Sequence, residues 1–218
     1  MDRHHGFAAC WKRLAAGLSA ALGLLLVAAP SMAIEEPAYE LIEQSDAFEL
    51  RDYPAILVAE TEVEASFQRA GNAAFGRLFR YISGANIGQV EIAMTAPVTQ
   101  AAGEKIEMTA PVTQQAAAGT QRVAFVMPAR FTASTVPKPT DERVVIREWP
   151  ARRVAVWRYG GRWTEQNYDE ALVRLDAELA TRGLVAIGAP TLARYDPPFK
   201  PWFMRRNEVW IPVDPGVE

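Results

Sequence analysis

Two segments that lie 96 residues apart carry the same pattern, and this repeat constrains the fold more than any other feature. Residues 50–59 read LRDYPAILVA and residues 146–155 read IREWPARRVA, so eight of ten positions are identical or close in character. In each copy a short alternating segment runs into a proline, Pro54 or Pro150, and a second strand-like segment follows. Alternation predicts a strand, and proline interrupts one. The repeat therefore predicts two strands in each half of the chain.

An amphipathic helix follows each copy at about the same distance. Ser66 is a candidate N-cap for a helix that ends near Gly84, and Thr164 is a candidate N-cap for a helix at about 162–179 that is closed by Gly183. The apolar residues of both segments recur at helical spacing. The two predicted helices are thus separated by about the same 96 residues as the two strand segments, so the sequence predicts an internal duplication.

The two halves are predicted to run over about residues 38–128 and 143–214, with a proline-containing linker at 132–141. Each half would hold an open sheet with one helix, and neither could bury its apolar face alone. We therefore expect an α+β fold: a distorted eight-stranded antiparallel β-barrel made of two pseudo-twofold ββαββ halves and flanked by two helices. The last strands are predicted at 190–195 and 208–213.

A second, shorter repeat lies inside the first half. Residues 92–100 (IAMTAPVTQ) return almost unchanged as residues 106–114 (IEMTAPVTQ), with Gly103 between them. This period is too short for a solenoid, where repeats of about 20–50 residues stack. The β-branched content favours two strands of a hairpin. The proline in each copy removes a ladder donor, which predicts a sheet edge or a bulge.

The N-terminal 33 residues have the pattern of a signal peptide. Basic residues precede an apolar run of about 16 residues, and Ser31-Met32-Ala33 forms a small-x-small cleavage site. The alternative is an uncleaved anchor, but the run is shorter than the roughly 18–20 residues of a spanning helix. We expect cleavage before Ile34, leaving a single domain over 34–218 with no stable membrane span. The protein would be exported, either to a periplasm or to the medium.

Removal of residues 1–33 would leave no thiol and no imidazole, because Cys10, His4 and His5 all lie there. A Ser-His-Asp triad, a cysteine nucleophile and a histidine-based zinc site are then excluded, and we expect no metal site. The removed part also holds three of the 23 basic and one of the 26 acidic residues, so the remainder has a net charge of about −5. This charge argues against a nucleic-acid partner.

The segment between the last two predicted strands has the composition of a binding site. Residues 196–207 (DPPFKPWFMRRN) contain three prolines, three aromatic residues and three cations. Prolines stiffen a loop, so its aromatic rings have little conformational entropy left to lose on binding. We interpret this loop as the most site-like segment of the chain.

The chain resembles the SOUL family, also called the haem-binding protein family. The resemblance rests on four motifs in order: MTAPV, FVMP at 125–128, PKP at 137–139 and RRNEVW at 205–210. It covers roughly residues 38–214. It implies a barrel of two βαββ-type halves, shared with effector-binding domains of transcription regulators, and haem or tetrapyrrole binding in a groove between the first helix and the loop before the last strand. The site residues it implies are Phe75, Leu78, Phe79, Ile82, Phe199, Lys200, Arg205 and Arg206.

Some members of this family have been proposed to ligate iron through a histidine, and residues 34–218 of this chain contain none. Haem iron is otherwise held by Cys, Met or Tyr, and Met204 is the best-placed candidate. We expect haem to be weakly ligated or unligated, in a monomeric carrier or scavenger without enzymatic activity. Two alternatives stay open: a carboxylate-based hydrolase using Glu208 or Asp196, and a module or envelope protein that binds another apolar ligand or none. The residues at helical spacing on the first helix are also compatible with plain core packing.

Overall fold

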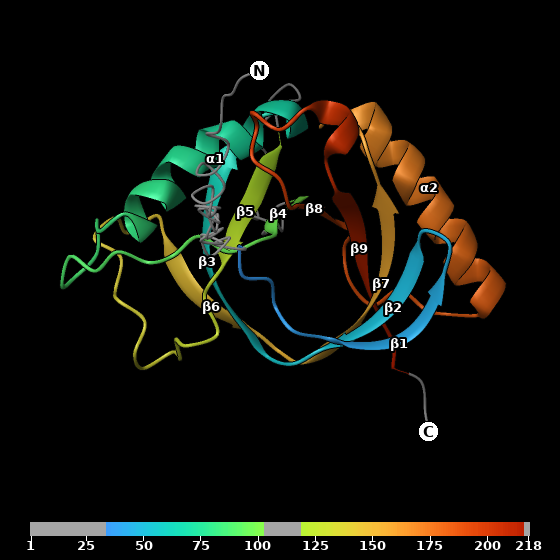
Figure 1. Ribbon diagram of the computed structural model, residues 1–218, viewed down its shortest axis with the longest axis horizontal. Coiled ribbons are helices and arrows are strands. Elements are labelled where there is room, and N and C mark those ends of the chain that lie inside the picture. The colour runs from blue at the N-terminus through green and yellow to red at the C-terminus, as the bar shows by residue number, and fades with distance from the viewer. Residues whose placement is uncertain (1–33, 103–118, 216–218) are drawn as a thin grey trace, which may run out of the picture. The chain divides into compact units, whose positions relative to one another are not determined.

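A computed structural model describes residues 34–102 and 119–215, which contain two α-helices, one short 3₁₀ helix and nine strands (Figure 1). The strands are β1 (Glu40–Ser45), β2 (Phe48–Tyr53), β3 (Ile56–Glu64), β4 (Val98–Ala102), β5 (Thr120–Val126), β6 (Val145–Trp149), β7 (Arg152–Tyr159), β8 (Thr191–Arg194) and β9 (Asn207–Val213). The helices are α1 (Phe67–Ile82), α2 (Glu165–Arg182) and η1 (Trp202–Met204). The predicted signal peptide at 1–33 lies outside the described residues.

All nine strands belong to one antiparallel sheet with the order β1-β2-β7-β9-β8-β4-β5-β3-β6. Apart from β1, this order is symmetric about its centre. The first strand of each half pairs with the second strand of the other half, so β2 lies against β7 and β6 lies against β3. Pro54 and Pro150 stand at the points where the chain passes from one sheet position to the other. The halves are thus joined by exchanged strands as well as by the central β4–β8 pair.

The strand registers reproduce the repeat of 96 residues. Tyr53 lies opposite Arg152 in the β2–β7 pair, and Trp149 lies opposite Ile56 in the β3–β6 pair. Trp149 is the counterpart of Tyr53, and Arg152 is the counterpart of Ile56, because each lies 96 residues further along the chain. The Trp149–Ile56 pair is therefore the Tyr53–Arg152 pair with the two halves interchanged. The predicted internal duplication is therefore expressed in the hydrogen bonding of the sheet.

The predicted eight-stranded barrel is wrong in two respects, the number of strands and its closure. The order begins at β1 and ends at β6, and no ladder joins these two strands within residues 34–102 and 119–215. The extra strand explains the difference, because β1 takes the outer edge of β2 through an antiparallel ladder from Glu40–Asp52 to Ser45–Phe48. That edge is therefore not free to close the sheet.

The first of the two short repeats, which the sequence predicts as one strand of a hairpin, is a strand only in part. Only its last part forms a strand, because β4 begins at Val98, and Pro97 precedes the ladder. Both edges of β4 are occupied, one by β5 and the other by β8. The second copy, at 106–114, lies outside the described residues, so its pairing stays a prediction.

Both helices begin and end where the sequence predicts. Ser66 and Thr164 are the N-cap residues, and the Thr164 hydroxyl accepts a hydrogen bond from the Asn167 backbone N–H at 3.2 Å. Gly183 caps α2 in the left-handed conformation with φ 66°, which glycine adopts without a Cβ clash. Helix α1 ends at Ile82, two residues before Gly84.

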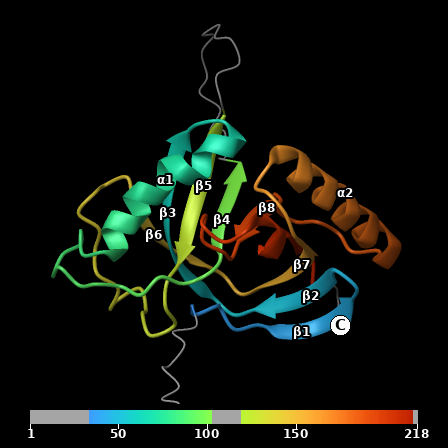
Figure 2. The ribbon, with the colours of Figure 1, turned by 45° about the horizontal axis from the view of Figure 1, so that its top comes forward.

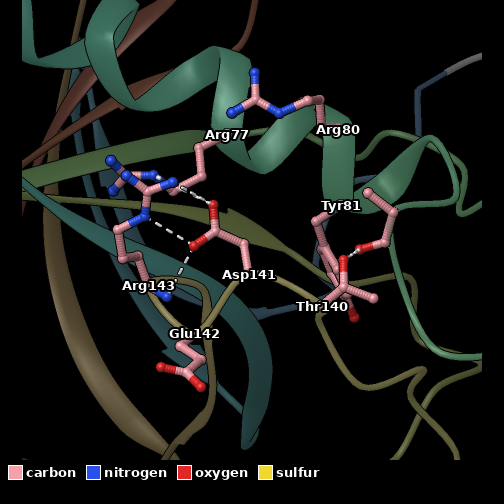
Figure 3. Close-up of a pocket in the computed structure, with 8 residues that line it drawn as sticks. Arg77, Arg80, Tyr81, Thr140, Asp141, Glu142 and Arg143 are labelled. Carbon is pink, nitrogen blue, oxygen red and sulfur yellow. Dashed lines mark hydrogen bonds and ion pairs between the residues drawn. The ribbon is translucent and has the colours of Figure 1, made fainter.

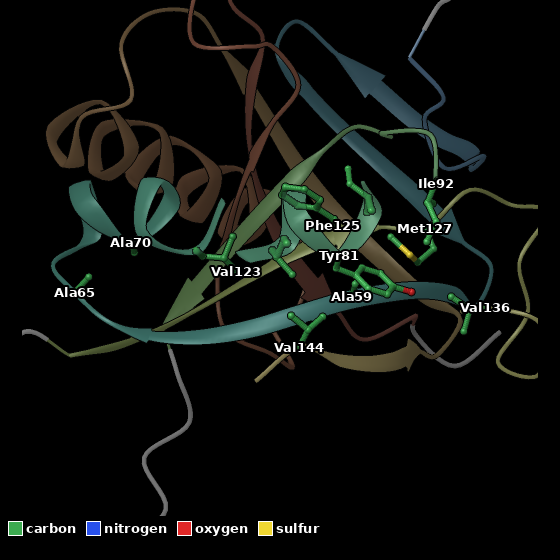
Figure 4. Packing of buried hydrophobic residues seen from close by; sticks show 13 residues of the cluster. Ala59, Ala65, Ala70, Tyr81, Ile92, Val123, Phe125, Met127, Val136 and Val144 are labelled. Atoms are coloured by element: carbon green, nitrogen blue, oxygen red, sulfur yellow. The ribbon is translucent and has the colours of Figure 1, made fainter. Parts of the chain in front are cut away.

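Each helix packs on the strands of its own half (Figure 2). Helix α1 covers β3 and β5, and it buries Ala70, Ala74 and Leu78 against residues such as Phe125 in the cluster drawn in Figure 4. Helix α2 covers β7 and β9 with a smaller cluster around Leu175. No helix in the described part of the chain is long and apolar enough to cross a membrane.

Candidate functional site

The four predicted ligand contacts on α1 divide into two pairs. Leu78 and Ile82 are 0% and 3% exposed and belong to the core beneath the helix. Phe75 and Phe79 are 36% and 44% exposed, and their rings are stacked with centroids 5.7 Å apart and an interplanar angle of 13°. Of these four residues, only the phenylalanine pair has surface to offer a flat ligand.

The β8–β9 loop presents a second exposed apolar set. Phe199 and Met204 are 87% and 59% exposed, and the loop also exposes Trp202 and Phe203, at 48% and 67%, which we had not predicted as site residues. The rings of Trp202 and Phe203 meet edge to face at 5.7 Å. Four large apolar side chains thus reach the surface within six positions, which is unusual for a surface without a binding partner.

The cations of this loop hold its backbone in shape. The guanidinium of Arg205 donates to the carbonyl oxygens of Lys200 and Pro198, at 2.8 and 2.5 Å. The carboxylate of Asp196 accepts from Lys200 Nζ and from the Arg206 backbone N–H, each at 2.5 Å. A carboxylate of haem that paired with Lys200 would have to compete with the carboxylate of Asp196.

Arg206 turns to acidic neighbours. It pairs with Glu36 and lies 3.8 Å from the carboxylate of Glu208, with its guanidinium over the ring of Tyr195 at 3.5 Å. Burial opposes the charge of Arg206, but these acidic neighbours outweigh burial and raise its pKa above the ordinary value. Of the predicted cations on the loop, Arg205 has no carboxylate partner among the described residues.

An arginine that sequence reasoning missed lies where the two helices approach each other. Arg194, at the end of β8, is 9% exposed and packs against the backbone of Gly71 on α1, where an added Cβ would be 2.3 Å from its Nη1. Its Nη2 donates to Gln100 Oε1 at 3.1 Å, and its Nε has no partner among the described residues. Burial without a carboxylate lowers the pKa of Arg194 to about 10. Nothing in its strand pattern distinguishes this arginine from an exposed one.

Trp163 connects this arginine to the loop. Its ring lies beneath Arg205 at 4.3 Å and beneath Arg194 at 5.1 Å, and its Nε1 donates to Asn207 Oδ1 at 2.7 Å. The N-terminal ends of α1 and α2 meet through the rings of Phe67 and Tyr168, 4.8 Å apart. The loop thus crosses the structure where both helices begin, as Figure 1 shows. No ring contact joins the Phe75 pair to the loop within the described ranges.

A cavity of about 530 Å³ lies at the other end of α1 (Figure 3). Its lining is polar: Asp141 accepts hydrogen bonds from Arg143, at 2.7 and 2.8 Å, and lies 3.9 Å from Arg77. Hydrogen bonds from Arg143 hold the pKa of Asp141 well below its usual range. A cavity walled by these ion pairs does not suit a flat apolar plate. Across the described ranges, no three His, Cys, Asp or Glu side chains gather to hold a metal ion.

The buried carboxylate of Glu208 lies on the sheet face opposite the helices. It is 1% exposed and accepts from Arg51 at 2.9 and 3.0 Å, and from Tyr195 Oη and Trp210 Nε1, each at 2.7 Å. Burial opposes the charge of Arg51, but hydrogen bonds and attraction to Glu208 outweigh it and raise the pKa of Arg51. A carboxylate held by four donors is fixed in place.

Comparisons with known proteins agree with the sequence resemblance. A family model described as SOUL heme-binding protein matches residues 34–212. Heme-binding protein 1 of Xenopus tropicalis is 28% identical over 170 residues, covering 76% of this chain and 83% of that protein. Heme-binding protein 1 of Mus musculus is 32% identical over 139 residues, covering 63% and 68%. The C-terminal domain of EcmrR superposes with a TM-score of 0.58 at 12% identity, over 81% of this chain and 98% of that one, and so shares its fold. The family match spans most of the sequence, and the chain belongs to the SOUL family of heme-binding proteins.

Proposed function

We propose that this chain is an exported carrier or scavenger of haem or a related tetrapyrrole, which it holds by apolar contact and without a histidine ligand. Membership of the SOUL family supports haem binding. The stacked and exposed pair of Phe75 and Phe79 carries the assignment of the site. A porphyrin is a flat apolar plate with carboxylates at its rim, and it suits an aromatic surface near cations.

The residues beyond the signal segment restrict how the iron could be held. They include no histidine and no cysteine. Met204 is 59% exposed, while Met94 is partly buried against the α1 core. An exposed thioether is a weak ligand that water can displace. When bound, haem would supply a redox-active iron, and the chain would contribute apolar contact area and charge complementarity.

Catalysis by the two carboxylates that sequence reasoning singled out has less support. Glu208 is held by Arg51, Tyr195 and Trp210, and Asp196 is held by Lys200 and a backbone N–H. Both are engaged in contacts that define the fold, and neither lines the cavities of about 180–530 Å³ found among the described residues. We therefore favour binding over hydrolysis as the activity of this protein.

A haemin titration of the chain beginning at Ile34 tests this function. The Soret band is expected to show saturable one-to-one binding with a small shift. The double substitution Phe75→Ala/Phe79→Ala removes the stacked pair and should weaken binding by about tenfold or more, since each ring contributes on the order of 1.5–3 kcal/mol when fully buried. Val173→Ala is the matched control, because Val173 is an exposed apolar residue of α2, 68% exposed.

Three outcomes contradict parts of the proposal. No saturable binding removes haem as the ligand and leaves the fold unaffected. Equal affinity of the double variant and the parent places the site elsewhere. A sharp six-coordinate spectrum shows that a methionine or tyrosine ligates the iron, and Met204→Leu then identifies or excludes Met204. N-terminal sequencing of protein recovered outside the cytoplasm tests export and cleavage before Ile34.

A further inference from the structure

We propose that the β8–β9 loop docks this protein onto the surface of a membrane that contains anionic lipids, with Phe199, Trp202 and Phe203 entering the interface. This inference goes beyond haem binding and does not depend on it. It rests on the exposure of these side chains, on the cations beside them, and on the way the loop is held.

Exposure on this loop exceeds what a solvated surface requires. Phe199, Phe203 and Met204 are 87%, 67% and 59% exposed, and Trp202 is 48% exposed. Trp202 and Phe203 lie on η1, a single turn in which no residue is buried. Tryptophan and other aromatic rings favour the boundary between headgroups and acyl chains. Three such rings on one short segment, with Met204 beside them, can enter that boundary together.

The charge next to these rings is positive. Arg162 lies over the ring of Trp202 at 5.4 Å, and Arg205 lies over Trp163 at 4.3 Å. Neither arginine forms an ion pair with a carboxylate in the described parts of the chain. The charge of Lys200 is offset by Asp196. Cations flanking inserted aromatic rings are placed to meet lipid phosphates, and anionic lipids attract them.

The loop is already ordered in the shape that would insert. Arg205 donates to two carbonyl oxygens of its own loop, and the carboxylate of Asp196 accepts the backbone N–H of Arg206. Pro197, Pro198 and Pro201 restrict the remaining backbone. Little conformational freedom is left to lose, so burial of the rings at a membrane contributes to binding with little entropic opposition.

A membrane fits this loop better than a second copy of the chain. An isologous interface would bring the same patch of each subunit together, and the Arg162 and Arg205 of both would face each other. A stable protein interface also needs about 800 Å² from each partner, which is more than these four partly exposed side chains provide. A lipid surface needs neither shape complementarity nor a matching patch.

Vesicle sedimentation of the chain beginning at Ile34, without haem, tests the proposal. The vesicles contain either phosphatidylcholine alone or equal parts of phosphatidylcholine and phosphatidylglycerol. The parent is expected to bind the anionic vesicles at least about tenfold more tightly, and added salt should weaken binding. Trp202→Ala/Phe203→Ala should reduce binding by about tenfold or more, and Arg162→Glu should reduce the preference for anionic lipid.

The control variant Val185→Ala/Ile187→Ala removes two apolar side chains of a different loop, 62% and 61% exposed, and should bind like the parent. Thermal unfolding checks that each variant folds. The proposal is overturned if the parent does not bind anionic vesicles, or if the Trp202→Ala/Phe203→Ala variant binds them as tightly as the parent does. Concentration-dependent dimers that this variant abolishes, without vesicle binding, would overturn it in favour of self-association. Vesicle sedimentation of Phe75→Ala/Phe79→Ala keeps the two proposals apart, because this variant should bind anionic vesicles as the parent does while its haem binding is weakened.

Discussion

Replacing Arg51 with methionine removes the cation that faces two buried carboxylates. Glu49 and Glu208 are 3% and 1% exposed, and Arg51 contacts both, through Nε to Glu49 at 2.7 Å and through its two terminal nitrogens to Glu208. Without Arg51, the Glu208 carboxylate keeps two neutral donors, Tyr195 and Trp210. Its remaining arginine neighbours are 3.8 and 4.0 Å away.

Removing one partner of a buried ion pair leaves an uncompensated charge and costs about 3–5 kcal/mol. We expect Arg51→Met to lose that much of the free energy of unfolding, which totals about 5–15 kcal/mol in small domains. Glu208→Gln keeps an acceptor for Tyr195 and Trp210, so it should cost less, about 1–3 kcal/mol. In the double variant Arg51 and the charge of Glu208 are both absent, and its loss should fall short of the sum by about 1 kcal/mol or more.

Urea unfolding at pH 7, followed by tryptophan fluorescence and by circular dichroism, measures these losses. Arg153→Met is the matched control, because Arg153 pairs with Asp52 near the surface, where their side chains are 22% and 34% exposed. Exposed pairs contribute about 0–1 kcal/mol. Equal losses for Arg51→Met and Arg153→Met, or additive losses in the double variant, would refute the account of Glu208 as a carboxylate fixed by its ion pair.

Two further predictions concern packing and pH. Gly71→Ala should destabilise the protein by about 1–3 kcal/mol in urea unfolding, because its Cβ would lie 2.3 Å from Arg194 Nη1. Gly76→Ala should instead stabilise the same helix by about 0.5–1 kcal/mol, because the nearest neighbour of its Cβ is 3.8 Å away. A loss of stability at both sites would show that the cost comes from the helix and not from Arg194. Burial opposes the negative charge of Glu49, but hydrogen bonds from arginines outweigh burial and lower the pKa of Glu49. A hydrogen bond from Arg153 likewise lowers the pKa of Asp52. Both carboxylates then contribute their full stabilisation above the unfolded values of about 4, and lose it as the pH falls through the lower folded values. Urea midpoints measured between pH 2 and 7 should fall at the acid end, less steeply in Asp52→Asn; an unchanged slope would contradict this assignment.

The candidate site shows where local patterns stop being informative. Helical spacing grouped Phe75, Leu78, Phe79 and Ile82 as one apolar set, but a helix on a sheet buries only the stripe that faces the strands. The structure places Leu78 and Ile82 in that stripe and leaves the phenylalanines half outside. Arg194 could not be recognised from its neighbours in sequence, because its burial comes from α1, from β4 and from the residues before α2.

Features that depend on local chemistry and on internal duplication could be predicted from the chain alone. They are both helices, through their capping residues, the proline-interrupted strands, and the offset of 96 residues that the registers reproduce. Only the folded molecule shows three other features: the first strands are exchanged between the halves, β1 occupies the outer edge of β2 so that the sheet stays open, and β4 has a partner on both edges. Alternation and caps specify where a strand or helix lies along the chain, but the partner of a strand is chosen by edges and surfaces that distant segments supply.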